Sequence, residues 1–435
     1  MKIGLEVHAY ARTKSKMHCA CSSAFLEGEP NTLVCETCTS QPGAKPNGVN
    51  REAVSVAKAA AALLGCEPKG EASVLRKHYF YPDLPSNYQR TSTPVGVNGV
   101  FQGVRIREIH FEEDPGQFDL KKKTLDFNRS GVPLMEIVTE PDLKSPEEAK
   151  SFVERLQAAL LYNELIRPEL GLKIDTNVSV AGGNRVEVKN VHSVKGMVAA
   201  IRFEEKRQRE AVSSGQKVRM ETRNYDEASE STTPSREKET EADYRYLPDP
   251  DLPAIDLSKV EAKAFTDPFK EVERLSSKLK ISTAVLETLV LSGFLKDFEE
   301  SCTHAAPGTA AFFYSSVLKG ELEYRGLSAS PLTAKDLKPV LTALDKKQVT
   351  QQGAAQLLRE LLDKGTVSMK TSISREELEK AVREVLQSEN AAVAKVKAGE
   401  VKVIEYLLGR VFKKLGPGTQ PGDVRREIKR VLGRL

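Results

Sequence analysis

Three apolar runs with the alternating pattern of β-strands each carry charged side chains in their interior. Residues 4–8 place Glu6 and His8 on one face of a strand, because successive side chains point to opposite faces. Residues 109–114 and 133–138 hold acids inside similar runs. An unpaired buried charge is costly, so these acids need a cation or an arginine. We expect the runs to meet around a hard divalent cation; the alternative is that the charges are ordinary strand-face residues.

The length and charge of the chain bound its organisation. A chain of 435 residues exceeds what one hydrophobic core serves, so about two to four domains are expected. The apolar runs are shorter than the about 20 residues of a membrane span, and the first residues lack the layout of a signal peptide, so we expect a cytoplasmic protein without a membrane segment. The net charge is +4, but residues 395–435 hold eleven Lys and Arg against four Asp and Glu. This basic tail is the expected contact for a polyanion.

Four of the six cysteines form two pairs that are close in the sequence. One residue separates Cys19 from Cys21, and two residues separate Cys35 from Cys38. This arrangement is typical of a tetrahedral zinc site, although about two to four intervening residues are usual within each pair. No open coordination position or base accompanies the cysteines. The sequence therefore predicts a structural zinc ion that holds an otherwise coreless loop.

Residues 76–85 are rich in aromatic and basic side chains, among them Lys77, Tyr79 and Tyr81. These side chains could stack a nucleotide base and bind phosphate, or could pack inward from an ordinary strand. Arg129 falls in a predicted turn, where it could bind a carboxylate or phosphate through two hydrogen bonds or could offset a neighbouring acid. The pattern leaves both pairs of alternatives open.

The remaining pattern of the first half predicts short antiparallel strands. The dipeptide Asn98-Gly99 indicates a hairpin turn. Residues 172–190 alternate as two strands, with Asp175, Asn177, Glu187 and Lys189 on one face, where they could bind a substrate or face water. Residues 221–243 are rich in Glu, Ser, Thr and Arg and predict a mobile loop.

The second half of the chain changes to helical spacing. Apolar residues recur at helical intervals from Thr266 onward, after prolines that indicate a boundary near residue 255. A capping box at residues 374–377 starts a small C-terminal bundle, and its last helix is strongly basic. The whole chain is therefore predicted to be α+β, with an all-α second half.

Taken together, the ordered motifs resemble the GatB family, the B subunits of tRNA-dependent amidotransferases. The similarity runs nearly end to end and is carried by residues 3–8, the two cysteine pairs, and residues 77–83, 109–114, 128–138, 243–246 and 406–414. It implies an enzyme that uses ATP to convert misacylated Glu-tRNA(Gln) or Asp-tRNA(Asn) into the amide form. It also implies a cradle domain with an antiparallel β-sheet and zinc knuckles (residues 1–255), a helical domain (256–372) and a small helical tail domain that contacts tRNA (373–435).

The resemblance also assigns roles to individual residues. It implies that Glu6, His8, Glu113 and Glu136 are catalytic and bind Mg²⁺, with Glu112 as a less certain neighbour. It places Lys77, Tyr79, Tyr81 and Arg129 where the nucleotide and the aminoacyl end are held. Cys19, Cys21, Cys35 and Cys38 correspond to the zinc ligands of the family.

The resemblance further implies partner subunits. The chain has no serine-rich amidase signature and no Cys/His pair in a convincing context, so ammonia must come from elsewhere. In the family it arrives through a channel from a glutaminase A subunit, with a small C subunit completing a heterotrimer. The archaeal E-type relative carries a large inserted domain, and no such insertion fits this chain, so the B type is favoured.

Two other classes of function fit part of the sequence. A non-catalytic tRNA-binding adaptor would keep the zinc site and the basic tail but would not need acids in separate strands. An ATP-dependent ligase that acts on a free amino acid would not need the tail. Both remain alternatives at this stage.

Overall fold

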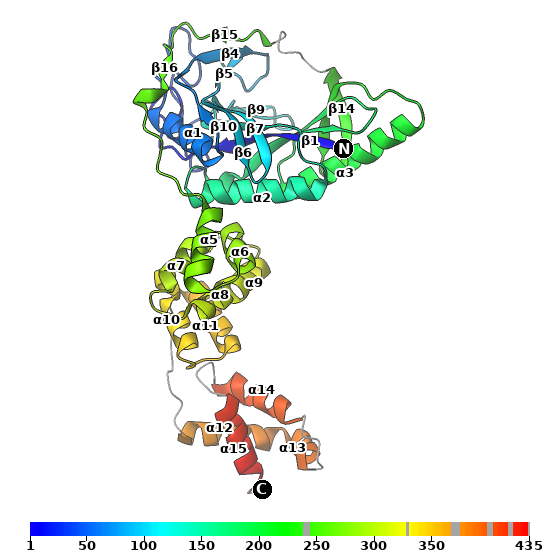
Figure 1. Ribbon diagram of the computed structural model, residues 1–435. Coiled ribbons are helices and arrows are strands. Elements are labelled where there is room, and N and C mark those ends of the chain that lie inside the picture. Colours follow the sequence, from blue (N-terminus) through cyan, green and yellow to red (C-terminus); the bar gives the residue numbers. More distant parts are fainter. Residues whose placement is uncertain (238–243, 328–329, 367–374, 398–402, 416–420, 434–435) are drawn as a thin grey trace. The chain divides into compact units, whose positions relative to one another are not determined.

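The computed structural model describes residues 1–237, 244–327, 330–366, 375–397, 403–415 and 421–433. The chain divides into two compact units, Met1–Pro268 and Phe269–Leu435 (Figure 1). The first unit is built on β-sheet with helices, and the described part of the second contains only helices, which confirms the predicted α+β class. The predicted domain limits at residues 255 and 372 stay predictions, and the second of these lies outside the described residues.

A sheet of twelve strands forms the frame of the first unit. Its order is β14-β13-β12-β11-β1-β10-β7-β5-β4-β15, with β6 and β2 following beside β7. Neighbours are antiparallel except β12 and β13. The strands are β1 (Lys2–Tyr10), β2 (Glu67–Pro68), β4 (Val74–His78), β5 (Tyr88–Ser92), β6 (Gly96–Phe101), β7 (Val104–Glu113), β10 (Pro133–Thr139), β11 (Leu172–Ser179), β12 (Val186–Lys189), β13 (Glu221–Asp226), β14 (Ser231–Glu237) and β15 (Leu247–Pro248). Two separate two-stranded sheets pair β3 (Glu71–Ala72) with β16 (Ile255–Asp256), and β8 (Gln117–Asp119) with β9 (Thr124–Asp126).

Strand β1 lies in the middle of the sheet, between β10 and β11. Ile3, Leu5 and Val7 are fully buried on one face. Alternation puts Glu6 and His8 on the other face, where Glu6 pairs with Val138 and Asp175, and His8 with Glu136 and Lys173. Strand β1 therefore carries its two charged side chains into the centre of a broad sheet, with an apolar face behind them.

Helices cover the apolar face of this sheet. They are α1 (Arg51–Leu63), which packs on β7, and the pair α2 (Pro146–Tyr162) and α3 (Val194–Ser213), of which α3 packs on β11 (Figure 1). The Ser145 side chain caps the first turn of helix α2 by accepting from the Glu148 backbone N–H, and the Glu148 carboxylate accepts from the Lys144 backbone N–H. Short 3₁₀ turns occur at Pro168–Leu170 and Leu257–Lys259.

Two local predictions in this unit are wrong. The hairpin expected at Asn98-Gly99 does not form there, because β6 continues through both residues and the chain turns at Gln102-Gly103, with φ of 49° and 78°. Residues 221–237 are not a mobile loop but the paired strands β13 and β14. Buried Glu204 of α3 anchors them through Arg223 and Thr232, which compensates for the few apolar residues of the segment.

The second unit is helical in all its described parts. Its first group contains α5 (Pro268–Leu279), α6 (Thr283–Leu291), α7 (Leu295–Ser301), α8 (Pro307–Phe312), a π-helical turn (Phe313–Leu318), α9 (Lys319–Arg325), α10 (Ala334–Asp345) and α11 (Gln351–Lys364). Buried leucines, valines and phenylalanines at helical spacing form its core, as the sequence pattern predicts. Among the described residues, no helix is both long enough and apolar enough to cross a membrane.

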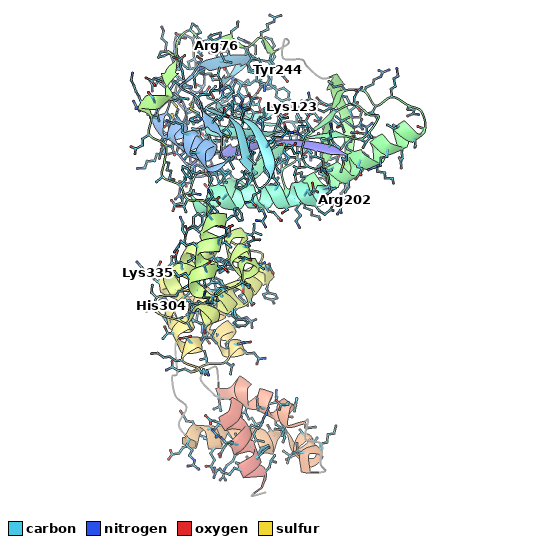
Figure 2. All side chains as sticks on the ribbon, viewed as in Figure 1. Arg76, Lys123, Arg202, Tyr244, His304 and Lys335 are labelled. Carbon is cyan, nitrogen blue, oxygen red and sulfur yellow. The ribbon has the colours of Figure 1, made fainter. Side chains whose placement is uncertain are left out.

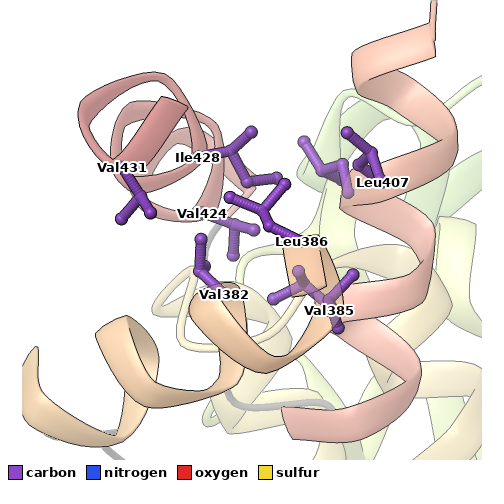
Figure 3. Close-up of a cluster of buried hydrophobic side chains, with 9 residues drawn as sticks. Val382, Val385, Leu386, Leu407, Val424, Ile428 and Val431 are labelled. Carbon is purple, nitrogen blue, oxygen red and sulfur yellow. The ribbon is translucent and has the colours of Figure 1, made fainter. Parts of the chain in front are cut away.

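The C-terminal helices α12 (Arg375–Ser388), α13 (Asn390–Lys397), α14 (Val403–Leu415) and α15 (Pro421–Leu432) pack as a small bundle. Their shared core is shown in Figure 3 and consists of Val382, Val385, Leu386, Leu407, Leu408, Val411, Val424, Ile428 and Val431. The predicted bundle is thus confirmed. Ser374 of the predicted capping box and the glycines at 399, 416 and 418 lie outside the described residues.

Candidate functional site

A cluster of an imidazole and two carboxylates crosses three adjacent strands of the sheet. His8 of β1 lies directly opposite Glu136 of β10, and Glu112 of β7 lies beside them. His8 Nε2 is 3.4 Å from Glu112 Oε1 and 3.8 Å from Glu136 Oε1. The three side chains are 18%, 5% and 22% exposed, so water screens them weakly. Segments more than a hundred residues apart in the sequence therefore meet at this cluster.

Proximity and burial perturb every member of the His8–Glu112–Glu136 cluster. Burial raises the pKa of Glu112, and the charge of Glu136 raises it further. Burial alone would lower the pKa of His8, but Glu112 and Glu136 outweigh it and raise that pKa. Burial opposes the ionisation of Glu136, yet His8 and Lys77 lower its pKa. The two carboxylates of the cluster repel each other, and an additional cation would relieve that repulsion.

The geometry of this cluster fits a hard divalent cation. One ligand atom from each residue lies within 4.8 Å of the others. A cation that binds its ligands at about 2.1 Å holds them about 3 to 4.2 Å apart, a range that includes both measured distances from His8. Oxygen ligands with one imidazole suit Mg²⁺ or Mn²⁺. His8, Glu112 and Glu136 are the residues that could hold such an ion.

Glu113, which the sequence analysis places among the metal ligands, is not part of this cluster. Because side chains alternate along β7, Glu113 points to the other face from Glu112. Its carboxylate is 3.3 Å from Arg90 Nη1, and its backbone oxygen accepts a hydrogen bond from the Gln89 side chain. The structure therefore brings together His8, Glu136 and the neighbour Glu112 instead.

Glu6 belongs to a second polar cluster, next to the first. Its carboxylate lies within 4.8 Å of those of Asp175 and Glu187. Lys189 Nζ is 3.0 Å from Asp175 Oδ2 and 3.2 Å from Glu187 Oε1, and Asn177 donates to Glu6 Oε1 at 3.0 Å. Burial, followed by the charge of Glu187, raises the pKa of Glu6. The polar face seen in residues 172–190 of the sequence therefore borders the metal-type cluster rather than facing water.

The predicted nucleotide-binding residues occupy β4 and the segment after it. Lys77 Nζ lies 4.9 Å from the centre of the ring of Tyr244, which is labelled in Figure 2, and Tyr79 packs edge-on against the same ring. Burial would lower the pKa of Lys77, but Glu112 and further groups raise it, which keeps the side chain protonated. Tyr81 differs from the other two because it is 55% exposed. Lys77 thus lies within electrostatic reach of Glu112 and Glu136 and packs beside the half-buried ring of Tyr244.

Asp249 forms a group of hydrogen-bonded charges with one arginine of β4 and one of β5. Asp249 accepts hydrogen bonds from Arg76 and Arg90 at 2.8–2.9 Å. Both guanidinium groups also lie over the Tyr88 ring, at 4.5 and 5.2 Å from its centre. The sequence gives no signal for Asp249, since it lies in a proline-rich stretch that looks like a linker. It ties that stretch to β4 and β5.

Arg129 uses its guanidinium group within the protein. Its Nε is 3.0 Å from Asp114 Oδ2, and it donates to the backbone oxygens of Pro115 and Gly116. Asp114 also accepts from Tyr10 at 2.6 Å and from Lys173. Of the two alternatives for Arg129, these contacts favour the offsetting of a neighbouring acid.

The four clustered cysteines converge on one point. One sulfur atom from each of Cys19, Cys21, Cys35 and Cys38 lies within 4.8 Å of the others. A tetrahedral zinc ion at about 2.3 Å from each sulfur holds the sulfurs about 3.8 Å apart, and the measured distance between Cys35 and Cys38 is 4.0 Å. The hydrogen bond from Cys19 lowers the pKa of Cys38 to about 5 against the effect of burial, and Lys16 adds to the lowering. The residues present fit zinc.

A small polar pocket lies between the second cysteine pair and the rim of the sheet. Its lining includes Thr37, Ser86, Arg90, Glu113 and Pro115. Glu113 therefore faces a pocket that the cysteine loop helps to build, and not the cluster around His8.

Comparisons with known proteins support the resemblance found in the motifs. The family model of the GatB/GatE catalytic domain matches residues 1–263, and that of the GatB domain matches residues 296–432. Among similar proteins is the B subunit of the aspartyl/glutamyl-tRNA(Asn/Gln) amidotransferase from Methanopyrus kandleri, 39% identical over 99% of this chain and 98% of the relative. Proteins of the same name from Methanothermobacter thermautotrophicus and Methanosphaera stadtmanae are 39% and 37% identical, and the similarity covers 97% and 100% of this chain and 98% and 100% of those relatives.

Proposed function

Because this chain belongs to the GatB family, we propose that it is the B subunit of an aspartyl/glutamyl-tRNA(Asn/Gln) amidotransferase. The reaction converts the side-chain carboxylate of misacylated Glu-tRNA(Gln) or Asp-tRNA(Asn) into an amide. The observation that carries the proposal at the level of the site is the buried cluster of His8, Glu112 and Glu136. Three strands bring together there an imidazole and two carboxylates, which a sheet with only a structural role would not need.

The chemistry of the reaction explains why such a cluster is useful. A carboxylate is a poor electrophile, so ATP first phosphorylates it and leaves ADP; ammonia then attacks the carbonyl carbon and phosphate departs. Mg²⁺, when bound, neutralises the charge on the phosphates and aligns the attacking oxygen. His8, Glu112 and Glu136 would hold that ion. Lys77, protonated and directed toward this cluster, would bind phosphate oxygens, and Tyr79 with Tyr244 would hold the nucleotide base or the aminoacyl end.

We propose that the second cluster, around Glu6, accepts a proton during the reaction. Ammonium has to lose a proton before its nitrogen can attack. Glu6 is half-buried and its pKa is raised, so its carboxylate is a suitable proton acceptor near the reacting atoms. Asp175, Glu187 and Lys189 would hold Glu6 in place and tune its charge.

The source of ammonia and the remaining partners complete the proposal. A separate glutaminase A subunit would supply ammonia, and a small C subunit would complete a heterotrimer in the cytoplasm. The basic C-terminal bundle would bind tRNA, and the four cysteines would hold a structural zinc ion that maintains the loop between them.

The direct test is amide formation by the chain, assembled with its partners, on Glu-tRNA(Gln) and Asp-tRNA(Asn) with ATP and glutamine. We expect amidated tRNA, lost with EDTA and restored by excess Mg²⁺. Glu136→Gln keeps the shape of the side chain but removes one charge, and should lower the amidation rate by about 100-fold or more. Binding of tRNA should stay unchanged in this variant.

Two outcomes would favour the alternatives. Full activity of the complex with Glu136→Gln would indicate a non-catalytic adaptor. Amide formation on free glutamate or aspartate with an unchanged KM after removal of residues 375–435 would indicate a ligase for free amino acids.

A further inference from the structure

The hairpin of β8 and β9 stands outside the main sheet and ends in a basic tip. The tip consists of Leu120, Lys121, Lys122 and Lys123, all of them exposed, with Leu120 at 72% (Figure 2). Adjacent ammonium groups repel one another, so this composition is stabilised by an anion that approaches the tip. Nothing in the phosphorylation or amidation chemistry uses these residues.

The conformation of the tip is fixed before any ligand arrives. The Asp119 carboxylate accepts from the backbone N–H groups of Lys121 and Lys122, at 2.9 and 3.0 Å, and closes the turn. Asp119 is thereby occupied with backbone groups, and its contact with the Lys122 ammonium is long, at 3.7 Å. The backbone that carries the lysines is thus ordered, so binding would cost less backbone entropy.

The base of the hairpin is clamped to the loop between the two cysteine pairs. Asn31 donates from its backbone to Asp126 at 2.9 Å and from its side chain to the Leu125 oxygen at 2.8 Å. Its side-chain oxygen accepts from the Phe127 backbone at 2.8 Å. The cysteine loop therefore sets the direction in which the hairpin projects.

The hairpin also rises from the edge of the candidate active site. It begins after Pro115, which lines the pocket beside Arg90, and Glu112 of the metal-type cluster lies only three residues before Pro115. The Gly116 backbone donates to the Asp83 oxygen at 2.8 Å, in the segment that carries exposed Phe80 and Tyr81. Exposed rings and exposed cations at one rim are typical of a surface that binds single-stranded or terminal nucleotides.

We propose that the tip of Lys121, Lys122 and Lys123 binds the RNA phosphate backbone close to the 3′ end and so directs the aminoacyl group toward His8, Glu112 and Glu136. This inference rests on the proposed function, since it concerns the substrate of the same site. Lysines at a hairpin tip act as point charges without base-edge partners, so the contact adds affinity and not sequence selectivity. Its strength depends on salt.

The test uses the full chain assembled with its partner subunits and a fluorescent acceptor-stem minihelix RNA with a 3′ CCA end. Replacement of Lys121, Lys122 and Lys123 by Ala should raise the Kd about 10-fold or more at low salt. The slope of log K against log salt should fall by about two, because each lost phosphate contact removes about 0.7 to 0.9.

Two further variants serve as controls. Replacement of exposed Lys69, Lys206 and Lys217 by Ala removes the same charge from the same unit and should change the Kd less than twofold. Arg at positions 121, 122 and 123 keeps the charge and should retain binding, with thermal unfolding unchanged in all three proteins.

Three results would overturn the inference: wild-type RNA binding by the triple Ala variant, an equal loss in the control variant, or loss of complex assembly with RNA binding intact. The readout is RNA binding and not amide formation. A chain that binds through the tip but forms no amide would contradict the proposed function alone, and normal amidation without a binding change would contradict only this inference.

Discussion

Glu112 and Glu113 are neighbours in the sequence but serve different surroundings. Alternation along β7 sends Glu112 toward His8 and Glu136 and sends Glu113 toward Arg90. The sequence pattern therefore does not distinguish the two adjacent acids, although they contact different partners in the fold. Only the register against β10 distinguishes them.

This pair provides a matched test of which acid serves the chemistry. We expect Glu112→Gln to lower the amidation rate about 100-fold and to raise the Mg²⁺ concentration needed for half-maximal rate, because it removes a ligand charge. Glu113→Gln keeps its hydrogen-bonding shape beside Arg90 and should stay within about fivefold of the wild type. Steady-state amidation over a Mg²⁺ series measures both. The reverse ranking of the two variants would restore Glu113 to the metal set.

Asp249 is predicted to make stability depend on pH in the acid range. Burial raises its pKa, but hydrogen bonds from Arg76 and Arg90 outweigh this and lower the pKa to about 2. The stabilisation is fully present above the unfolded pKa of about 3.9 and is lost as the pH falls from about 4 through 2. Asp249→Asn should cost about 2 kcal/mol at pH 7, with the difference from wild type vanishing near pH 2, in urea unfolding of the full chain.

The control for this prediction is Asp142→Asn. Asp142 also pairs with an arginine, but Arg105 is 64% exposed, so the loss should be below about 1 kcal/mol. Equal losses for the two variants at pH 7 would show that burial of the Asp249 pair has no special effect.

At the scale of elements, the sequence predicts the structure that depends on the local pattern of residues. It misses the structure that depends on contacts between residues far apart in the chain. The strands in residues 172–190 depend on a local signal, and they are confirmed. The signal at Asn98-Gly99 is overridden because pairing with β7 continues through it. Residues 221–237 contain too few apolar residues to indicate strands; Glu204 of a separate helix supplies the missing partner.

The same distinction between local patterns and distant contacts applies to the candidate site. The sequence identifies Glu6, His8, Glu136 and the polar face around Asp175, since their alternation is visible along each strand. It does not reveal that Glu6 faces Asp175 and Glu187 while His8 faces Glu112 and Glu136, because that depends on how five strands line up. It also cannot show that Asp249 reaches back to Arg76.

The cysteine loop is predicted to stabilise its surroundings through zinc. Cys35→Ser should abolish stoichiometric zinc, measured by elemental analysis, and lower the Tm by about 5–10 °C, or about 2–4 kcal/mol for a unit of this size. Protease cleavage near residues 19–38 should increase. Cys302→Ser, which changes a cysteine outside the cluster, should retain the metal. Zinc retained at full stoichiometry in Cys35→Ser would argue against a four-cysteine site.

At the scale of the whole molecule, the arginines of the basic tail are less available to a ligand than the composition of the tail indicates. Arg425 pairs with Glu405, Arg426 with Asp423, and Arg430 with both Glu379 and Glu427. A phosphate group that binds these arginines replaces acids already in contact with them. The tail should therefore add less salt dependence to RNA binding than its excess of cations predicts.

Removal of residues 375–435 tests the role of this bundle. We expect the KM for misacylated tRNA to rise about 10-fold or more while kcat stays within about threefold, since the proposed chemistry lies in the first unit. Amidation kinetics of the truncated chain, assembled with its partners, measure both constants. A fall in kcat with an unchanged KM would assign the bundle to the chemical step instead.

The central position of β1 has a consequence for biosynthesis. Lys2–Tyr10 is synthesised more than a hundred residues before either of the strands that flank it, Pro133–Thr139 and Leu172–Ser179. Until translation passes residue 139 both edges of this segment lack a partner, and the edge that pairs with β11 stays open until residue 179 has been added. The nascent chain is therefore vulnerable to aggregation until both edges of β1 are paired, and a chaperone that shields Lys2–Tyr10 would protect it.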